Sequence, residues 1–266
     1  MDATAAALLV VAGAAAGFLS GALAIGDGIV MVPVLLIVLR GAGVSSLVST
    51  QVAMGTSLAA TAAASLVLAW SARKRDQVIG RDALVVGLSG AVAALAAVAI
   101  ACSLEGPSLR KVFGVLLLIA AVRLFAGKKK SAAAEQSGAF PKLTLAGLCG
   151  GLTAGLTGSG GTVVAAPLLH RYVLLPLRKA VGTAHAAAAA CAAAGALAFV
   201  LWGWTSEFLP AGMHGFVDWP SAAALAVGAV PGAVMGDRFG ATADKTPVRA
   251  TYAVILLVVM LRMFFA

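Results

Sequence analysis

Two short glycine clusters, each inside a long apolar run, are the residues whose types and spacing point most directly to chemistry. The first is Gly26-Asp27-Gly28 and the second is Ser159-Gly160-Gly161-Thr162. Glycine adopts unusual backbone angles cheaply and lets a ligand approach the backbone closely. Helices that begin directly after these clusters, at Ile29 and Val163, would direct unpaired N–H groups and positive dipole ends toward a common anion. The pattern therefore predicts an oxyanion site built from backbone amides and the two hydroxyls of the second cluster.

Three hydroxyl residues and one histidine are further candidates for this site. Thr56, Ser57 and Thr183 follow glycines early in the apolar segments that come after each cluster. Their hydroxyls either reach the same centre or bond back to their own helix. His185 lies among alanines, where it either relays protons or packs as a neutral side chain. Asp27 either caps the following half-helix or takes up a proton when an anion binds nearby, which would couple anion to proton.

Glycines spaced four residues apart precede each cluster and have a simpler explanation. Gly17 and Gly21, and likewise Gly151 and Gly155, have the small-x3-small spacing that lets membrane helices pack closely. We expect these four glycines to pack helices together. At the clusters themselves we favour the ligand, because a non-helical break at membrane depth is tolerated mainly where it is buried in protein or lines a cavity.

The composition is that of a membrane protein. Of the 266 residues, 61% are hydrophobic and 11% are charged, whereas roughly 25% are charged in soluble proteins. As one helix, the apolar run over residues 5–39 would be about 52 Å long, well beyond a bilayer core of about 30 Å. The first glycine cluster therefore divides the run into two half-helices that meet inside the membrane, an arrangement that marks substrate sites in transporters.

The charged residues and cysteines exclude several classes of protein. The formal net charge is +9, but the basic residues fall in short clusters between apolar segments. Such clusters are a topology signal, and we expect no nucleic-acid partner. The three cysteines lie in or at the end of apolar runs, so no disulfide framework is expected. Histidines and cysteines show no compact metal spacing, and we predict neither a metal nor a cofactor.

The chain contains an internal duplication. Residues 17–36 align without gaps on residues 151–170, and six pairs are identical: Gly17/Gly151, Gly21/Gly155, Gly26/Gly160, Val30/Val164, Pro33/Pro167 and Leu35/Leu169. Gly55-Thr56 also matches Gly182-Thr183. A sustained polar segment separates the two copies. The predicted organisation is a first membrane repeat over residues 1–127, a cytoplasmic linker over 128–142 and a second membrane repeat over 143–266.

Lysine and arginine in the loops indicate that the two repeats have opposite orientations. The basic loops are 73–81 and 128–142 in the first half and 170–179 and 237–249 in the second. Residues 203–218 contain Glu207 but no lysine or arginine, which places them outside. Lys142 and Arg171 then both face the cytoplasm, so the stretch between them is a hairpin. We predict an all-α polytopic membrane protein with two inverted four-span repeats, each beginning with a glycine-broken or re-entrant helix hairpin.

The duplicated pattern resembles a known family. Gly-x3-Gly-x4-Gly-x-Gly followed by proline occurs at residues 17–33 and, with variation, at 151–167, and Gly-Phe-Val-Asp-Trp occurs at 215–219. In this order, across nearly the whole chain, these motifs resemble the TauE/SafE sulfite exporter family. The resemblance implies a secondary carrier in the bacterial inner membrane for a small sulfur-containing anion: sulfite, thiosulfate, sulfoacetate or a related organosulfonate.

From these observations we predict an exporter with proton coupling through Asp27 and His185. Its expected partners are the anion and membrane lipid, and the oligomeric state is left open. Two other functions stay open. One is a channel-like anion or metabolite pore, and the other is a membrane-embedded enzyme that uses His185 with a serine.

Overall fold

The structure, a computed structural model, describes residues 3–24, 26–125, 139–204, 206, 208–209 and 213–242. Over these residues its regular elements are all helices. The helices are α1 (Ala3–Leu23), α2 (Gly28–Gly41), α3 (Ser49–Lys74), α4 (Gly80–Ser103), α5 (Gly106–Phe125), α6 (Phe140–Thr157), α7 (Thr162–Arg171), α8 (Leu177–Gly203) and α9 (Trp219–Thr242). Within this part α1, α3, α4, α8 and α9 are long and apolar enough to cross a membrane. The predicted all-α, multi-pass class is confirmed.

Both predicted breaks are confirmed. α1 ends at Leu23 and α2 begins at Gly28, and α6 ends at Thr157 and α7 begins at Thr162. Each half-helix starts one residue before the predicted position. With 14 and 10 residues, α2 and α7 are about 21 Å and 15 Å long, so neither can cross a bilayer core by itself.

The second break reverses the chain through left-handed backbone. Gly158, which caps the C-terminal end of α6, has φ 66°, and Gly160 and Gly161 have φ 68° and 80°. Residues with a Cβ adopt this region only at a cost, whereas glycine does so freely. The glycines therefore allow α6 to end and α7 to begin within four residues.

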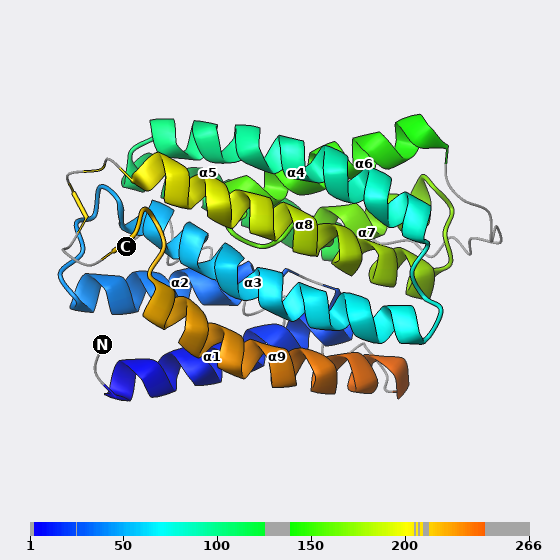
Figure 1. The fold of residues 1–266 in the computed structure, drawn as a ribbon, viewed down its shortest axis with the longest axis horizontal. Coiled ribbons are helices and arrows are strands. Elements are labelled where there is room, and N and C mark those ends of the chain that lie inside the picture. The colour runs from blue at the N-terminus through cyan, green and yellow to red at the C-terminus, as the bar shows by residue number, and fades with distance from the viewer. Residues whose placement is uncertain are drawn as a thin grey trace.

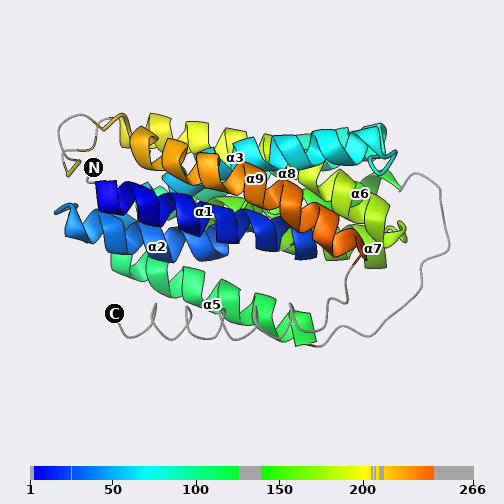
Figure 2. The same cartoon turned by 90° about the horizontal axis from the view of Figure 1, so that it is seen from below.

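The two broken segments enter the bundle from opposite ends (Figure 1). α1 begins and α2 ends at the end of the bundle that holds residues 42–48. α6 begins and α7 ends at the opposite end, which holds residues 75–79 (Figures 1 and 2). Leu143 near the start of α6 shares a buried cluster with Leu169 in the last turn of α7 and with Leu175 in the loop after it, as such a hairpin requires. We refer to these as the 42–48 end and the 75–79 end.

Glycines bring the backbones of two helix pairs into contact. α1 packs along α9, and α6 packs along α4. A Cβ added at each predicted packing glycine would meet the neighbouring helix: Gly17 against Ala229, Gly21 against Ala233, Gly151 against Gly90 and Gly155 against Ala97. The packing role predicted for these four glycines is confirmed. Close approach matters here because lipid tails are as apolar as the side chains, which leaves van der Waals contact as the main attraction between helices.

Some predictions concern residues outside the described part of the chain. These residues are the linker as far as residue 138, Glu207 in the loop predicted to lie outside, and the part of the second repeat beyond Thr242. Helix α6 begins at Phe140, inside the segment predicted as linker. The inverted four-span repeat stays a prediction, because the second repeat is described only as far as Thr242.

Candidate functional site

The two glycine breaks touch each other in the interior. A Cβ at Gly26 would lie 2.5 Å from the carbonyl oxygen of Ser159 and 2.7 Å from its Cβ, and one at Gly28 would collide with the backbone of Gly158. Real Cβ atoms do not approach so closely, so this contact requires glycine at both positions of the first break. The predicted convergence of the two breaks is therefore confirmed as a contact between the halves of the chain.

Hydroxyl groups hold the second break in place. Ser57 Oγ donates a hydrogen bond of 2.9 Å to the Gly158 carbonyl oxygen, as expected for a side chain that reaches this centre. Thr157 Oγ1 lies 2.6 Å from the Thr153 carbonyl oxygen and 2.6 Å from Ser159 Oγ. Since a hydroxyl has one proton, Thr157 donates to Thr153 and Ser159 donates to Thr157. In this arrangement the Ser159 proton is used within the second break, and its role as a donor to a ligand stays a prediction.

Four buried side chains around the breaks carry polar atoms that have no hydrogen-bond partner in the described part of the chain. They are Asp27 (Oδ2), Thr61 (Oγ1), Thr162 (Oγ1) and His185 (both ring nitrogens), and none is more than 2% exposed. We call them the central cluster. Buried polar groups in native proteins almost always have partners, and leaving one unsatisfied is costly. The cluster is therefore the place in this interior best suited to a polar ligand.

The members of the central cluster come from segments that meet at the second break. Thr61 lies beside Asp27 without forming a hydrogen bond of good geometry. The Thr61 methyl group would be 2.7 Å from a Cβ at Gly160, which also faces Ala188 at 3.7 Å. Ala188 is one turn of α8 beyond His185, and Thr162 is two residues beyond Gly160. Gly161 packs against the backbone of Gly150.

Asp27 does not cap α2. It stands at the N-cap position, but its side chain makes no cap hydrogen bond. Its own backbone is already helical, with φ −62° and ψ −31°, whereas a capping side chain normally requires an extended backbone at that residue. The capping alternative is therefore wrong, and the carboxylate is left inside the central cluster.

Thr56 and Thr183 do not reach the breaks. Thr56 Oγ1 accepts a hydrogen bond of 2.9 Å from the Asp218 N–H, and Thr183 Oγ1 accepts one of 3.2 Å from the Ile79 N–H. Asp218 and Ile79 directly precede α9 and α4, so the two equivalent threonines fasten the starts of two helices. The reason is helical geometry: neighbouring residues point about 100° apart, and where Ser57 faces the break, Thr56 faces α9.

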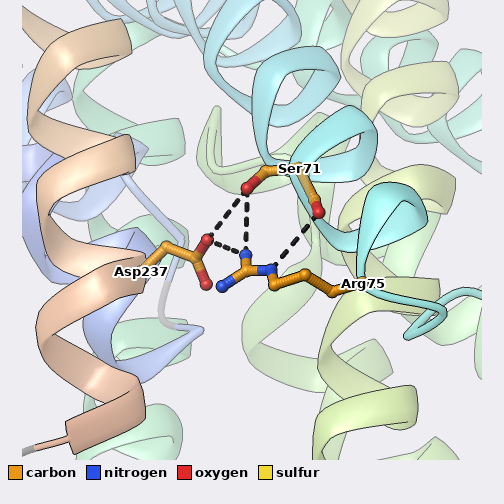
Figure 3. Close-up of polar contacts among 3 residues, drawn as sticks. All are labelled: Ser71, Arg75 and Asp237. Atoms are coloured by element: carbon orange, nitrogen blue, oxygen red, sulfur yellow. Dashed lines mark hydrogen bonds and ion pairs between the residues drawn. The ribbon is translucent and has the colours of Figure 1, made fainter.

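Ser71, Arg75 and Asp237 form a polar network near the 75–79 end (Figure 3). Asp237 on α9 forms an ion pair with Arg75 and accepts a hydrogen bond of 3.3 Å from Ser71 Oγ, and Arg75 donates to that hydroxyl at 3.0 Å. The ion pair is partly exposed, so it is accessible from the solution at that end.

Thr61 and Asp237 are the residues of this region that sequence reasoning missed. Thr61 follows Ser57 by four residues on α3, and residues at that spacing share one helix face. This spacing was a usable signal once Ser57 was a candidate. Nothing in the sequence pattern marks Asp237, because its partners Ser71 and Arg75 lie more than 160 residues away in the chain.

Comparison with known proteins agrees with this architecture. Residues 9–263 match the sulfite exporter TauE/SafE family. A probable membrane transporter protein of Haemophilus influenzae is 25% identical over 265 residues, which cover 97% of each of the two chains. No solved structure matches. The match runs through both glycine breaks, so the resemblance noted in the sequence is confirmed and the chain belongs to the sulfite exporter TauE/SafE family.

Proposed function

We propose that this protein is a secondary transporter that exports a small sulfur-containing anion, such as sulfite, thiosulfate, sulfoacetate or a related organosulfonate, across the bacterial inner membrane. Family membership supports the substrate class. The observation that carries the proposal is the central cluster, a group of buried polar side chains without partners at the contact of two broken helices. Broken helices that meet inside the membrane are the usual setting of substrate sites in secondary transporters.

The anion binds between the starts of two half-helices. α2 and α7 both begin at the contact of the breaks, and the first turn of a helix offers N–H groups without intrahelical partners together with a positive dipole end. Thr61 and Thr162 add hydroxyl donors. The central cluster contains no lysine or arginine, so the anion is held by neutral donors and is released more easily than from a buried ion pair.

Asp27 couples the anion to a proton. An ionised Asp27 and a bound anion would place two negative charges together, and each then favours protonation of the other. Uptake of a proton by Asp27 removes this repulsion, so anion and proton bind together. His185, the histidine of the central cluster, relays the proton toward the 75–79 end.

Counterflow in proteoliposomes tests the transport activity. Vesicles that contain the purified protein are loaded with unlabelled sulfite, thiosulfate or sulfoacetate, and the uptake of the same labelled anion is measured. A carrier takes up labelled anion faster when substrate is present on the opposite side. Equal uptake with and without internal substrate would identify a pore, and a chemically altered product would identify an enzyme. No uptake of any of the three anions would contradict the substrate class.

A matched pair of variants ties the activity to the breaks. In Gly26→Val the new side chain would meet Ser159, whereas at Gly41 nothing lies within 4 Å of an added Cβ. We expect Gly26→Val to lose anion binding and uptake, and Gly41→Val to keep both. Size-exclusion profiles and circular dichroism of the two proteins establish that each is folded. Unchanged binding in folded Gly26→Val would contradict a site at the breaks.

A further inference from the structure

Arg110 is a buried arginine whose guanidinium group has free donors. Its exposure is 7%, and its Nε and Nη2 atoms have no hydrogen-bond partner among the described residues. These two nitrogens form one edge of the planar guanidinium. That edge matches the spacing of two oxygens on a single carboxylate, sulfonate, sulfate or phosphate group, which it binds with two parallel hydrogen bonds.

The position of Arg110 is fixed by contacts at the start of α5. The Gly106 N–H donates to the Leu47 carbonyl oxygen at 2.9 Å, and Thr50 Oγ1 donates to the Gly106 carbonyl oxygen at 3.0 Å. These bonds hold the first residue of α5 at the 42–48 end (Figure 2). Arg110 is four residues further, about 6 Å deeper along the helix axis. It is therefore close to the solution but covered by protein.

The charges around Arg110 leave its own charge unbalanced. Arg40, in the last turn of α2, is near enough for the two positive charges to repel each other. Glu105, the nearest acidic residue in sequence, is exposed and forms no ion pair with Arg110. The Arg75–Asp237 ion pair lies at the other end. A buried charge without a counter-charge is strongly unfavourable, so this site is completed by an anion.

We propose that Arg110 binds an oxyanion at the 42–48 end, in a site separate from the central cluster. The ligand carries a sulfonate, sulfate or phosphate group, which meets the Nε and Nη2 donors side by side. Two sources supply such a group: a free anion from solution and the head group of an acidic phospholipid. The site does not depend on which anion the protein transports.

The first experiment uses inorganic sulfate as the probe and a neighbouring lysine as the control. Lys111 is exposed and adjacent to Arg110 in the sequence. Lys111→Gln therefore removes one positive charge at the same end and leaves the buried guanidinium group of Arg110 in place. We expect sulfate to raise the unfolding temperature of the full-length wild type and Lys111→Gln in neutral detergent, at constant ionic strength. In Arg110→Gln the apparent affinity for sulfate falls by ~10-fold or more. Arg110→Lys keeps the positive charge but lacks the two parallel donors of the guanidinium edge, so its affinity for sulfate is intermediate.

The second experiment separates the two sources of the ligand. The three proteins are purified with phosphatidylglycerol, and the bound lipid is counted by native mass spectrometry. If the lipid occupies the site, wild type and Lys111→Gln retain one more phosphatidylglycerol than Arg110→Gln does, and sulfate displaces it. General stabilisation by sulfate affects all variants equally and so drops out of the comparison.

Two results would overturn the proposal. One is a sulfate response and lipid count in Arg110→Gln and Arg110→Lys that equal those of Lys111→Gln. The other is a loss of stability in Arg110→Gln that is constant at every sulfate and lipid concentration, which indicates a purely structural arginine. Both measurements report binding without transport, so a failure here is distinct from a failure of the counterflow assay.

Discussion

Asp27 has a buried carboxylate oxygen with no partner, at the contact of the two breaks. Its repeat mate in the second half is Gly161, so the fold does not need an acidic group at this place in both halves. Because the side chain does not cap α2, its presence is better explained by what binds beside it. In the proposed mechanism, proton uptake by Asp27 and anion binding favour each other, and the consequence can be measured as a pH dependence.

Asp27→Asn removes this dependence. In the wild type, anion affinity should increase as pH falls, because a protonated Asp27 does not repel the anion. The asparagine variant should bind with an affinity that changes little with pH. The measurement is a binding titration from mildly acidic to mildly basic pH, with a sulfonate whose own ionisation is constant over that range. Asp76→Asn, in an exposed loop, is the control and should keep the wild-type profile. Parallel profiles in all three proteins would rule out Asp27 as the coupling residue.

Thr61→Val tests the hydroxyl beside Asp27. Valine has the shape of threonine without the hydroxyl, and Thr61 Oγ1 has no partner to lose in the described structure. The free energy of unfolding should therefore change by less than ~1 kcal/mol, while anion affinity falls about tenfold, as for a lost hydrogen bond to a charged group. Thr144→Val is the control, since the Thr144 hydroxyl is exposed and bonds the Phe140 carbonyl of its own helix. Equal affinities in both variants would remove Thr61 from the site.

At the scale of elements, the two broken segments depend on long helices that hold them. α1 lies along α9 and α6 lies along α4, in both cases through glycines that bring backbones together. α2 and α7 are too short to anchor themselves in a bilayer. The glycine contacts of α1 and α6 therefore fix the positions from which the two half-helices start.

Gly17→Ala should destabilise the protein by about 1–3 kcal/mol, the usual cost of overpacking a tight contact. The added methyl group would meet the Ala229 backbone, which cannot rotate away as a flexible side chain does. Gly41→Ala makes the same chemical change at the end of α2, where nothing lies within 4 Å. The unfolding temperature of the two variants in detergent provides the comparison. Equal unfolding temperatures would show that α1 and α9 do not pack so closely.

At the scale of the whole molecule, the hairpins open toward opposite ends of the bundle (Figure 1). The 75–79 end carries the basic residues Arg73, Lys74 and Arg75, and basic residues favour the cytoplasmic side. Helix α6 begins and α7 ends at this same end. The Glu105 end of α4 lies at the 42–48 end, where Gly106 bonds Leu47. We therefore expect the 75–79 end to face the cytoplasm and the 42–48 end to face the opposite side of the membrane.

Single cysteines at Lys142 and Arg171 should react with a membrane-impermeant thiol reagent from the cytoplasmic face, and one at Glu105 should react from the opposite face. The background protein has its own cysteines, Cys102, Cys149 and Cys191, replaced by serine or alanine. Reaction is compared in intact cells and in inside-out vesicles. Labelling of Lys142 and Arg171 from opposite faces would contradict the hairpin orientation and favour a parallel duplication.

The positions of the breaks follow from local sequence alone. An apolar run longer than a bilayer must be interrupted, and Gly26 and Gly28 in one half and Gly160 and Gly161 in the other are where interruption costs least. The same residues carry the family pattern. The length of an apolar run and its glycine content depend only on residues that are close in sequence, so both can be recognised without knowledge of the tertiary structure.

Only the tertiary structure decided which polar groups belong to the site. Ser57 faces the second break and Thr56 does not, and the proton of Ser159 is used by Thr157. Arg110 is buried without a counter-charge, although its sequence context is that of a loop next to an apolar segment. In each case the outcome depends on which faces of sequence-distant helices pack together, and that choice is made by contacts across the whole bundle.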